Sequence, residues 1–298
     1  MPELPEVETI RRHLAPHVEG RVLERLEIHD ARWSLPLAPA ELSAAVEGRR
    51  VDRLGRRGKY LVWHLAGDAH LMLHLRMTGT LLLRPPERPA HTRVTFGLGD
   101  GELLFVDARR FGTGELALGE EALDAFFAAR LGVEPFEPAF TGAHLHALAR
   151  RCRAPVKAML LDQKRIAGVG NIYADEALFR ARVHPLRPAE RLSRKQCDAL
   201  RDAVVESLAL GIESKGATID DFRDPDGVSG SFQDRFLVHT RAGEPCPRCG
   251  TTIQKLRAAG RGTYVCPSCQ RRPKSSASSR HFQRQSTSPK PSSRSQVS

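Results

Sequence analysis

The sequence predicts an α+β chain of several domains: a leading helix, an antiparallel β-sandwich or barrel, a helical region and a cysteine-bearing hairpin. Three observations predict this order. Apolar residues recur at helical spacing near the start, short alternating runs follow to about residue 118, and two close cysteine pairs stand near the end. With 298 residues, the chain is long enough for two domains, or for one large domain with appendages.

The first helix is predicted over residues 5–18. Val7, Ile10 and Leu14 fall on one face of it, and Pro5 suits a first helical turn. Residues 21–118 then hold short runs that alternate between apolar and polar side chains and are separated by Gly, Pro and Asp turns. These runs predict the sandwich or barrel; they are VLERLEIH, KYLVWHL, HLMLHLRM, RVTFGLG and ELLFVDA.

The second half of the chain is predicted to be mainly helical. GVEPFEPAF has the composition of an interdomain linker, residues 142–213 show helical patterns, and residues 214–234 predict a long loop. The Ser/Pro/Arg-rich end is expected to be disordered. We therefore expect four parts, which are a β-sandwich domain over 2–135, a helical domain over 136–240, a zinc-binding hairpin over 241–271 and a disordered basic tail over 272–298.

The net charge of +11 is concentrated near the C-terminus, with +7 in residues 271–298 and +4 in residues 241–270. A basic balance of this kind favours nucleic acid as the partner. No run approaches 18 consecutive apolar residues, which predicts no membrane span, and the acids near the start differ from a secretory signal. The cysteine pairs indicate a reducing compartment. We expect a cytoplasmic monomer.

Four cysteines have the spacing C-x2-C-x16-C-x2-C, which is typical of a structural zinc site. Each pair holds two thiolates on a tight turn, and four ligands leave no open position for chemistry. The alternatives are two disulfides or free thiols. Cys152 and Cys197 lack such a spacing and are expected to be buried helix positions. The predicted zinc ligands are Cys246, Cys249, Cys266 and Cys269.

AGVGNIYADEALF places Gly168 and Gly170 just before Asn171, at a predicted helix start. Free N–H groups and the helix dipole attract an anion at such a position. Asn171 is expected to cap the helix or to reach a phosphate oxygen. The alternative is an ordinary tight turn.

Pro2 becomes a free secondary amine if Met1 is removed. Such an amine can attack an electrophilic sugar carbon and form an iminium ion. The following helix lowers the pKa of the amine, which favours its neutral, nucleophilic form. Glu3 is then a candidate general acid or base, and Glu6 a candidate to orient or protonate the leaving sugar oxygen. The alternative is an exposed proline followed by solvated acids.

Seven blocks of sequence, in order across residues 2–271, resemble the formamidopyrimidine-DNA glycosylases, which are bacterial 8-oxoguanine-DNA glycosylases and AP lyases. The resemblance implies a catalytic helix leading the β-sandwich, a helix–two-turn–helix domain and a zinc finger on a β-hairpin. It also implies one structural Zn²⁺, damaged double-stranded DNA as partner, and action at the bacterial nucleoid. The blocks are PELPEVETIRR, GKYL, HLRMTG, DARRFG, LLDQKRIAGVGNIYADEALFRARVHP, DGVSGSFQ and GEPCPRCG…GRGTYVCPSCQ.

The same resemblance implies roles for individual residues. Pro2 would attack C1′ of the damaged nucleotide, with Glu3 as its acid–base partner. The loop over 217–230 would close on an everted 8-oxoguanine. Lys59 and Arg261 would bind phosphates at the catalytic centre. His74 and Asn171 would bind other phosphates around the lesion. Met77, Arg109 and Phe111 would form a wedge that fills the gap left by the flipped base. Lys157 would lie near that base.

Two residues depart from the family pattern. Arg76 stands where glycine is common, and Ala108 stands where proline is frequent. Both are expected to alter the wedge and not the chemistry. Two other functions stay open: an endonuclease VIII-like glycosylase for oxidised pyrimidines, and a noncatalytic DNA-binding zinc protein. PELPEVET and the complete 217–230 loop favour the enzyme for oxidised purines, which cleaves the strand by β- and δ-elimination after base removal.

Overall fold

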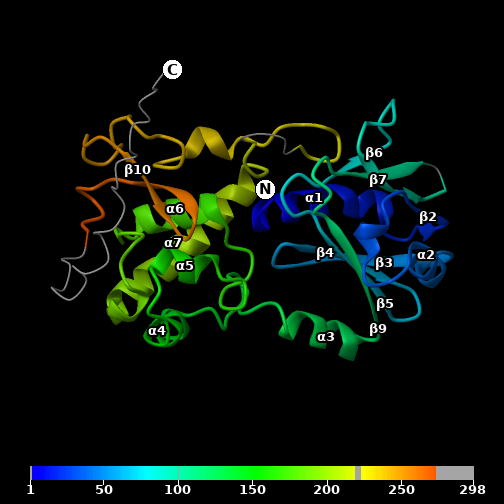
Figure 1. Ribbon diagram of the computed structural model, residues 1–298, viewed down its shortest axis with the longest axis horizontal. Coiled ribbons are helices and arrows are strands. Elements are labelled where there is room, and N and C mark those ends of the chain that lie inside the picture. Colours follow the sequence, from blue (N-terminus) through cyan, green and yellow to red (C-terminus); the bar gives the residue numbers. More distant parts are fainter. Residues whose placement is uncertain (1, 100, 219–222, 273–298) are drawn as a thin grey trace, which may run out of the picture.

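The computed structural model describes residues 2–99, 101–218 and 223–272, and it shows two units side by side with the N-terminus between them (Figure 1). The predicted disordered tail lies, apart from residue 272, outside the described residues, as do residues 219–222 of the expected lesion loop. Within the described ranges, no helix is long and apolar enough to cross a membrane.

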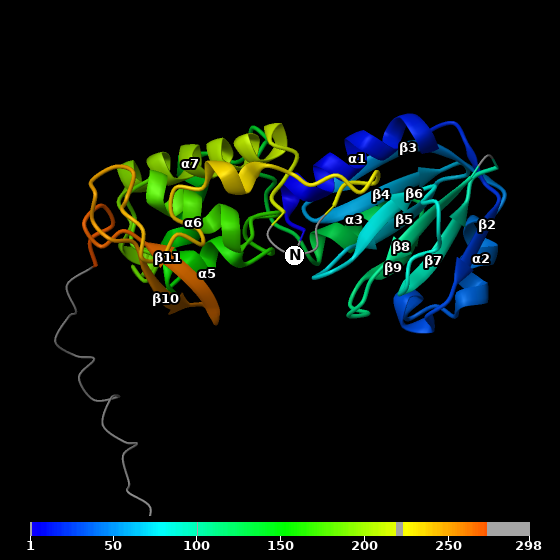
Figure 2. The ribbon, with the colours of Figure 1, turned by 90° about the horizontal axis from the view of Figure 1, so that it is seen from above.

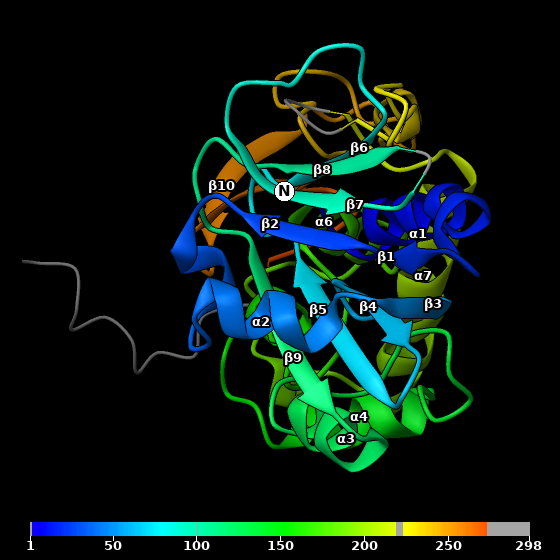
Figure 3. The same cartoon turned by 90° about the vertical axis from the view of Figure 1, so that its right-hand side faces the viewer.

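Two antiparallel sheets form the first unit, and Figure 3 looks at them from one end, with helix α2 (Pro39–Val46) across the front. Trp63, Phe96 and Phe105 fill the core between the sheets. The five-stranded sheet has the order β1 (Val22–Leu23), β3 (Arg49–Arg57), β4 (Tyr60–Leu65), β5 (Ala69–His74) and β9 (Thr113–Leu118). The four-stranded sheet has the order β2 (Arg25–Ile28), β7 (Thr92–Gly97), β8 (Glu102–Val106) and β6 (Thr80–Leu83).

Two of the predicted strands differ in detail from those of the sandwich. VLERLEIH is two strands, because the chain leaves one sheet at Glu24 and joins the other: β1 pairs with β3, and β2 pairs with β7. Strand β5 is buried along its whole length although it contains His70 and His74. Helix α3 (Glu120–Ala128) causes this burial, because Leu123 and Phe126 cover the sheet face that carries Met72.

Helix α1 (Leu4–Val18) connects the cores of the two units (Figure 2). Val7, Ile10 and Leu14 pack into the sandwich core, as their predicted common face requires. Leu4 instead belongs to the core of the helical unit, and its N–H donates to the carbonyl of Gly168 at 3.1 Å. The first turn of α1 is therefore fixed at the boundary between the units.

The helical unit has its elements where the sequence predicts them, within residues 142–213. They are α4 (Gly142–Arg150), α5 (Val156–Leu161), α6 (Asn171–Arg180) and α7 (Arg194–Glu213), with a short 3₁₀ turn at Ala189–Arg191. Two further 3₁₀ turns lie outside this range, at Ala31–Ser34 in the sandwich and at Phe232–Arg235 after α7. The hairpin β10 (Gln254–Ala258) and β11 (Arg261–Val265) turns through Ala259 and Gly260, both at positive φ. Phe179 of α6 packs against Cys266, which fixes the cysteine module on the helical unit.

Candidate active site

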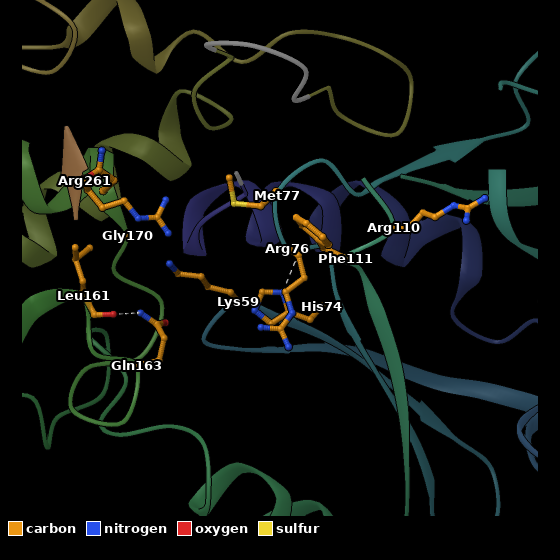
Figure 4. Close-up of a pocket in the computed structure, with 11 residues that line it drawn as sticks. Lys59, His74, Arg76, Met77, Arg110, Phe111, Leu161, Gln163, Gly170 and Arg261 are labelled. Carbon is orange, nitrogen blue, oxygen red and sulfur yellow. Dashed lines mark hydrogen bonds between the residues drawn. The ribbon is translucent and has the colours of Figure 1, made fainter. Parts of the chain in front are cut away.

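A cavity of about 590 Å³ opens at the boundary between the two units (Figure 4). The described residues of its wall include four cationic side chains and no acidic one. Lys59 and Arg261 extend toward each other from opposite sides, whereas Arg110 points away. The surface therefore suits an anionic ligand. The lining comprises Lys59, His74, Arg76, Met77, Arg110, Phe111, Leu161, Gln163, Gly170, Asn171 and Arg261.

Glu3 is buried beside this cavity, with an exposed fraction of 1%, and Pro2 is buried next to it. One oxygen of its carboxylate, Oε1, accepts a hydrogen bond from the N–H of Ile172 at 3.2 Å. The other oxygen has no partner among the described residues. A buried carboxylate with one unpaired oxygen is destabilising and calls for a functional explanation, so Glu3 is a candidate for proton transfer.

The glycine turn before α6 holds the N-terminus of the chain. A Cβ at Gly170 would lie 2.1 Å from Cδ of Glu3, and one at Gly168 would lie 2.5 Å from the Leu4 side chain. Gly168 also has a φ of +82°. The group at the start of α6 is thus the Glu3 carboxyl, and a phosphate at this turn stays a prediction.

Asn171 does not cap α6, because the N-cap residue is Gly170. The predicted capping role of Asn171 is therefore wrong. The Asn171 side chain instead donates from Nδ2 to the carbonyl of Gly262 at 3.2 Å, while its Oδ1 has no partner among the described residues. Asn171 therefore joins the start of α6 to the hairpin and also lines the cavity.

Glu6 is fully bonded as an acceptor. Its Oε2 accepts from the N–H of Glu3 at 2.8 Å, and its Oε1 accepts from the hydroxyl of Tyr173 at 2.7 Å and from the N–H of Ala217 at 2.8 Å. Burial, and then the nearby Glu3, raise the pKa of Glu6. Because the side chain is enclosed by these partners and does not line the cavity, it orients Glu3 and does not reach a leaving oxygen.

Lys59 is buried, with an exposed fraction of 6%, and forms no hydrogen bond or ion pair within the described ranges. Burial lowers its pKa, whereas Glu3 and Glu6 raise it and Arg261 lowers it further. An unpaired buried ammonium gains much from an anion. Lys59 is thus available to pair with a phosphate or another negatively charged group that enters the cavity.

His74 presents a hydrogen-bond donor to the cavity. Its Nδ1 accepts the N–H of Arg76 at 2.9 Å, so the proton of the neutral ring lies on Nε2. Burial, together with Arg76 and Lys59, lowers its pKa to about 3. The ring is therefore neutral at physiological pH and presents one N–H donor to the cavity.

The DARRFG segment projects Phe111, which is 49% exposed, from a loop organised by Asp107. The Asp107 carboxylate accepts from the N–H groups of Arg109, Phe111 and Gly112. The guanidinium of Arg109 lies 4.8 Å from the centre of the Phe111 ring. Met77 shares the cavity wall with Phe111, so the structure brings these three predicted residues together. Sequence reasoning missed Asp107, although an Asp followed by a turn is a recognisable signal.

Three family profiles match the chain in order: the formamidopyrimidine-DNA glycosylase N-terminal domain over residues 1–114, the formamidopyrimidine-DNA glycosylase H2TH domain over 131–223, and the zinc finger found in FPG and IleRS over 243–272. The formamidopyrimidine-DNA glycosylase of Heliobacterium modesticaldum is 46% identical over 278 residues, which cover 91% of this chain and 100% of the relative. The chain belongs to the formamidopyrimidine-DNA glycosylase family. It is therefore an enzyme, a DNA glycosylase of DNA repair.

Solved structures of formamidopyrimidine-DNA glycosylases share this fold. The MutM (Fpg) protein from Thermus thermophilus superposes with a TM-score of 0.83 at 43% identity, covering 90% of this chain and 98% of its own. A Lactococcus lactis Fpg mutant in complex with Fapy-dG-containing DNA gives 0.86 at 35% identity, covering 91% and 100%. The predicted fold class is confirmed, with the helix–two-turn–helix unit between the sandwich and the zinc finger.

The four cysteines of this glycosylase form a zinc site and no disulfides. Their sulfurs lie within 4.8 Å of one another, with separations of 3.5 Å between Cys249 and Cys266 and 4.0 Å between Cys246 and Cys269. A tetrahedral ion with Zn–S bonds of about 2.3 Å spaces its sulfurs by about 3.8 Å, so the cluster fits one structural Zn²⁺. Cys152 and Cys197 are buried in the helical unit, as predicted.

Lys157 lies in α5 and pairs with residues of α6 and the hairpin. Its side chain has no exposed surface, and Nζ donates to Asp175 at 2.6 Å and to the hydroxyl of Thr263 at 2.7 Å. Asp175 also pairs with His239 at 2.9 Å. Lys157 therefore links α5 and α6 to the hairpin that carries Arg261, and its place near the damaged base stays a prediction.

Arg76, the departure from the family glycine, adopts a φ of +55°. A residue with a Cβ costs about 1–2 kcal/mol there, while glycine costs about 0.5–1 kcal/mol in chain entropy. Arg76→Gly is therefore expected to raise the free energy of unfolding by up to about 1 kcal/mol, measured by urea unfolding. Arg57→Gly, in strand β3, should lower it. A loss of stability in Arg76→Gly equal to that of Arg57→Gly would contradict the assignment of strain.

Proposed function

We propose that this enzyme excises oxidised purines, such as 8-oxoguanine and formamidopyrimidines, from double-stranded DNA and then cleaves the abasic strand by β- and δ-elimination. The observation that carries the proposal is the buried pair of Pro2 and Glu3 at the edge of a basic cavity, with one carboxylate oxygen free. The proposal places the enzyme at the bacterial nucleoid, acting as a monomer.

Pro2 and Glu3 supply the chemistry of base removal. The neutral amine of Pro2 forms a bond to C1′, and the bond from C1′ to the base breaks with its electron pair leaving on the base. One proton comes from the attacking amine and one from Glu3; together they neutralise the base and protonate the ring oxygen O4′, which opens the sugar. The product is an iminium ion between Pro2 and C1′.

The iminium ion prepares strand cleavage. It withdraws electrons from C2′, so a C2′ proton is lost to a base and the C3′–O bond breaks in β-elimination, with its electron pair leaving on the phosphate. In the second elimination a C4′ proton is lost and the C5′–O bond breaks, with its electron pair leaving on the other phosphate. Water then hydrolyses the iminium to release Pro2 and the sugar remnant. Glu3 is the nearest carboxylate for these transfers, since Glu6 is occupied by three donors.

Side chains of the cavity wall would bind the phosphates of the DNA. Lys59, Arg261 and the Nε2–H of His74 are donors for phosphate oxygens, and Asn171 adds an amide. Contacts to phosphate position the duplex and read no sequence. The base must leave the stack to reach Pro2, and Met77, Arg109 and Phe111 are placed to fill the gap.

Borohydride trapping on an 8-oxoguanine duplex tests this function, because only an iminium ion is reduced to a stable cross-link between protein and DNA. A cross-link at residue 2, together with preference for 8-oxoguanine over an oxidised pyrimidine in a lesion panel, is the expected result. DNA binding without any cross-link would indicate a noncatalytic zinc protein. Preference for oxidised pyrimidines would indicate an endonuclease VIII-like specificity.

Arg261 allows the DNA contact of the zinc finger to be tested separately from the structural role of the zinc finger. It follows directly after the turn of the hairpin and lines the cavity, away from the cysteine sulfurs. Arg261→Ala is expected to retain its zinc and to weaken DNA binding by about 1.5–3 kcal/mol, the scale of a charged hydrogen bond. The slope of log affinity against log salt should become shallower by about one unit.

The loss should be similar for 8-oxoguanine and abasic duplexes, because a phosphate contact reads no base. Arg257→Ala, in strand β10 of the same hairpin and outside the cavity lining, is the matched control. Unchanged affinity and slope in Arg261→Ala would remove this residue from the site.

A further inference from the structure

A second group of metal-ligand side chains lies in the sandwich, away from the cysteine site. His64 of β4 and His70 of β5 are paired across the two strands, and their Nδ1 atoms are 3.0 Å apart. Glu120, the first residue of α3, places Oε1 3.8 Å from Nε2 of His70. Each of the three residues offers a ligand atom within 4.8 Å of the other two.

Hydrogen bonds determine where the protons of the histidine pair lie. Arg53 Nη2 is 3.0 Å from Nε2 of His64, and since arginine only donates, that nitrogen accepts. His64 therefore carries its proton on Nδ1 and donates it to Nδ1 of His70. His70 in turn carries its proton on Nε2 and donates to Asp68 at 3.2 Å. One proton thus occupies the space between the two Nδ1 atoms.

That space also matches a metal ion. Two nitrogens bound to one tetrahedral ion with Zn–N bonds of about 2.0–2.1 Å lie about 3.3 Å apart, so the pair must open only slightly. His70, with an exposed fraction of 3%, is held by Asp68, the carboxylate–histidine arrangement that orients metal-binding imidazoles. His64 is half-buried and can rotate.

We propose that His64, His70 and Glu120 form a second metal site, selective for a divalent transition ion such as Zn²⁺. The two Nδ1 atoms are the first protein ligands, and the exposed Glu120 side chain, whose Oε1 lies 3.8 Å from Nε2 of His70, turns toward them to supply the third. Water completes the coordination. Two imidazoles and a carboxylate are ligands that Zn²⁺ prefers. The site would connect the β4–β5 turn to the first residue of α3.

Metal binding requires a change at Arg53. When the ion takes Nδ1 of His64, the proton of the neutral ring moves to Nε2, which then faces the guanidinium as a second donor. Arg53 is exposed and can swing away, but its charge opposes the ion in either position. Arg53 therefore limits the affinity of the site, and its removal should strengthen binding.

The test is a Zn²⁺ titration of the full-length protein with its cysteine site already loaded, in competition with a zinc-binding dye. We expect one further equivalent of Zn²⁺. His64→Gln and Glu120→Gln should each weaken this equivalent by more than about ten-fold while the first is retained. Arg53→Ala should bind the further equivalent more tightly than the unmodified chain.

Controls separate this site from adventitious binding. His146→Gln changes another histidine, on α4, and should leave the further equivalent unchanged. Glu120 is 67% exposed, so its variant is expected to fold, and circular dichroism checks this for each protein. The absence of a second equivalent in the unmodified chain would overturn the proposal. So would a second equivalent that survives both His64→Gln and Glu120→Gln.

Discussion

A protein that keeps an uncleaved N-terminal extension is expected to lose both base excision and strand cleavage. Pro2 is a secondary amine only as the first residue, and an amide nitrogen at that position is not a nucleophile. Pro2 and Glu3 are also buried, so there is little room for additional residues before them. Single-turnover assays on an 8-oxoguanine duplex should show no product above the rate without enzyme.

The control is an extension that a site-specific protease removes to regenerate Pro2. Activity should return after cleavage, which shows that the extended protein was folded. Zinc content and unfolding temperature are measured on both forms. Excision at the normal rate by the uncleaved protein would show that Pro2 is not the nucleophile.

Gly170→Ala is expected to reduce base excision by at least about 100-fold, because displacing a catalytic group by about 1 Å has an effect of this size. The new Cβ would lie 2.1 Å from Cδ of Glu3, so the carboxylate must leave its position beside Ile172. The loss of stability should be modest, about 1–3 kcal/mol, since the displaced atoms end a side chain. Comparing single-turnover rates with urea unfolding separates the two effects.

Gly97→Ala is a suitable comparison, because its new Cβ would lie 3.3 Å from its nearest neighbour, in strand β7 and outside the cavity lining. That variant should excise normally. Normal excision by Gly170→Ala would mean that the position of Glu3 is unimportant and would argue against its role in proton transfer.

The zinc site, the first helix and the helices within residues 142–213 could be predicted because their signals are local. Two C-x2-C pairs define a tetrahedral site, and the buried face of α1 follows from apolar periodicity. Helices α2 and α3 were not predicted. Strand β3 escaped prediction because most of its residues are charged, and it is recognisable only from its pairing with β1 and β4. Its position depends on tertiary contacts that override local preference.

The candidate site shows the same limit. The resemblance named Glu3 and the glycine turn separately, and only the structure shows that Gly170 makes room for the Glu3 carboxylate. The contacts of Lys157 escaped prediction for a related reason, because its partner Thr263 is 106 residues away in sequence. Pairings over such distances leave no trace in spacing or periodicity, so the sequence identifies the participants and not their contacts.

The long-range contacts of the N-terminal residues have a consequence for protein synthesis. Pro2 and Glu3 are the first residues to leave the ribosome, but Glu3 meets Ile172 across 169 residues and Glu6 meets Ala217 across 211 residues. Domains generally fold in order as they are synthesised, so the sandwich forms before these partners exist. The contacts of Glu3 and Glu6 are therefore incomplete until most of the chain has been translated. A nascent or truncated glycosylase would lack the arrangement of Pro2 and Glu3 in which we propose that base excision occurs.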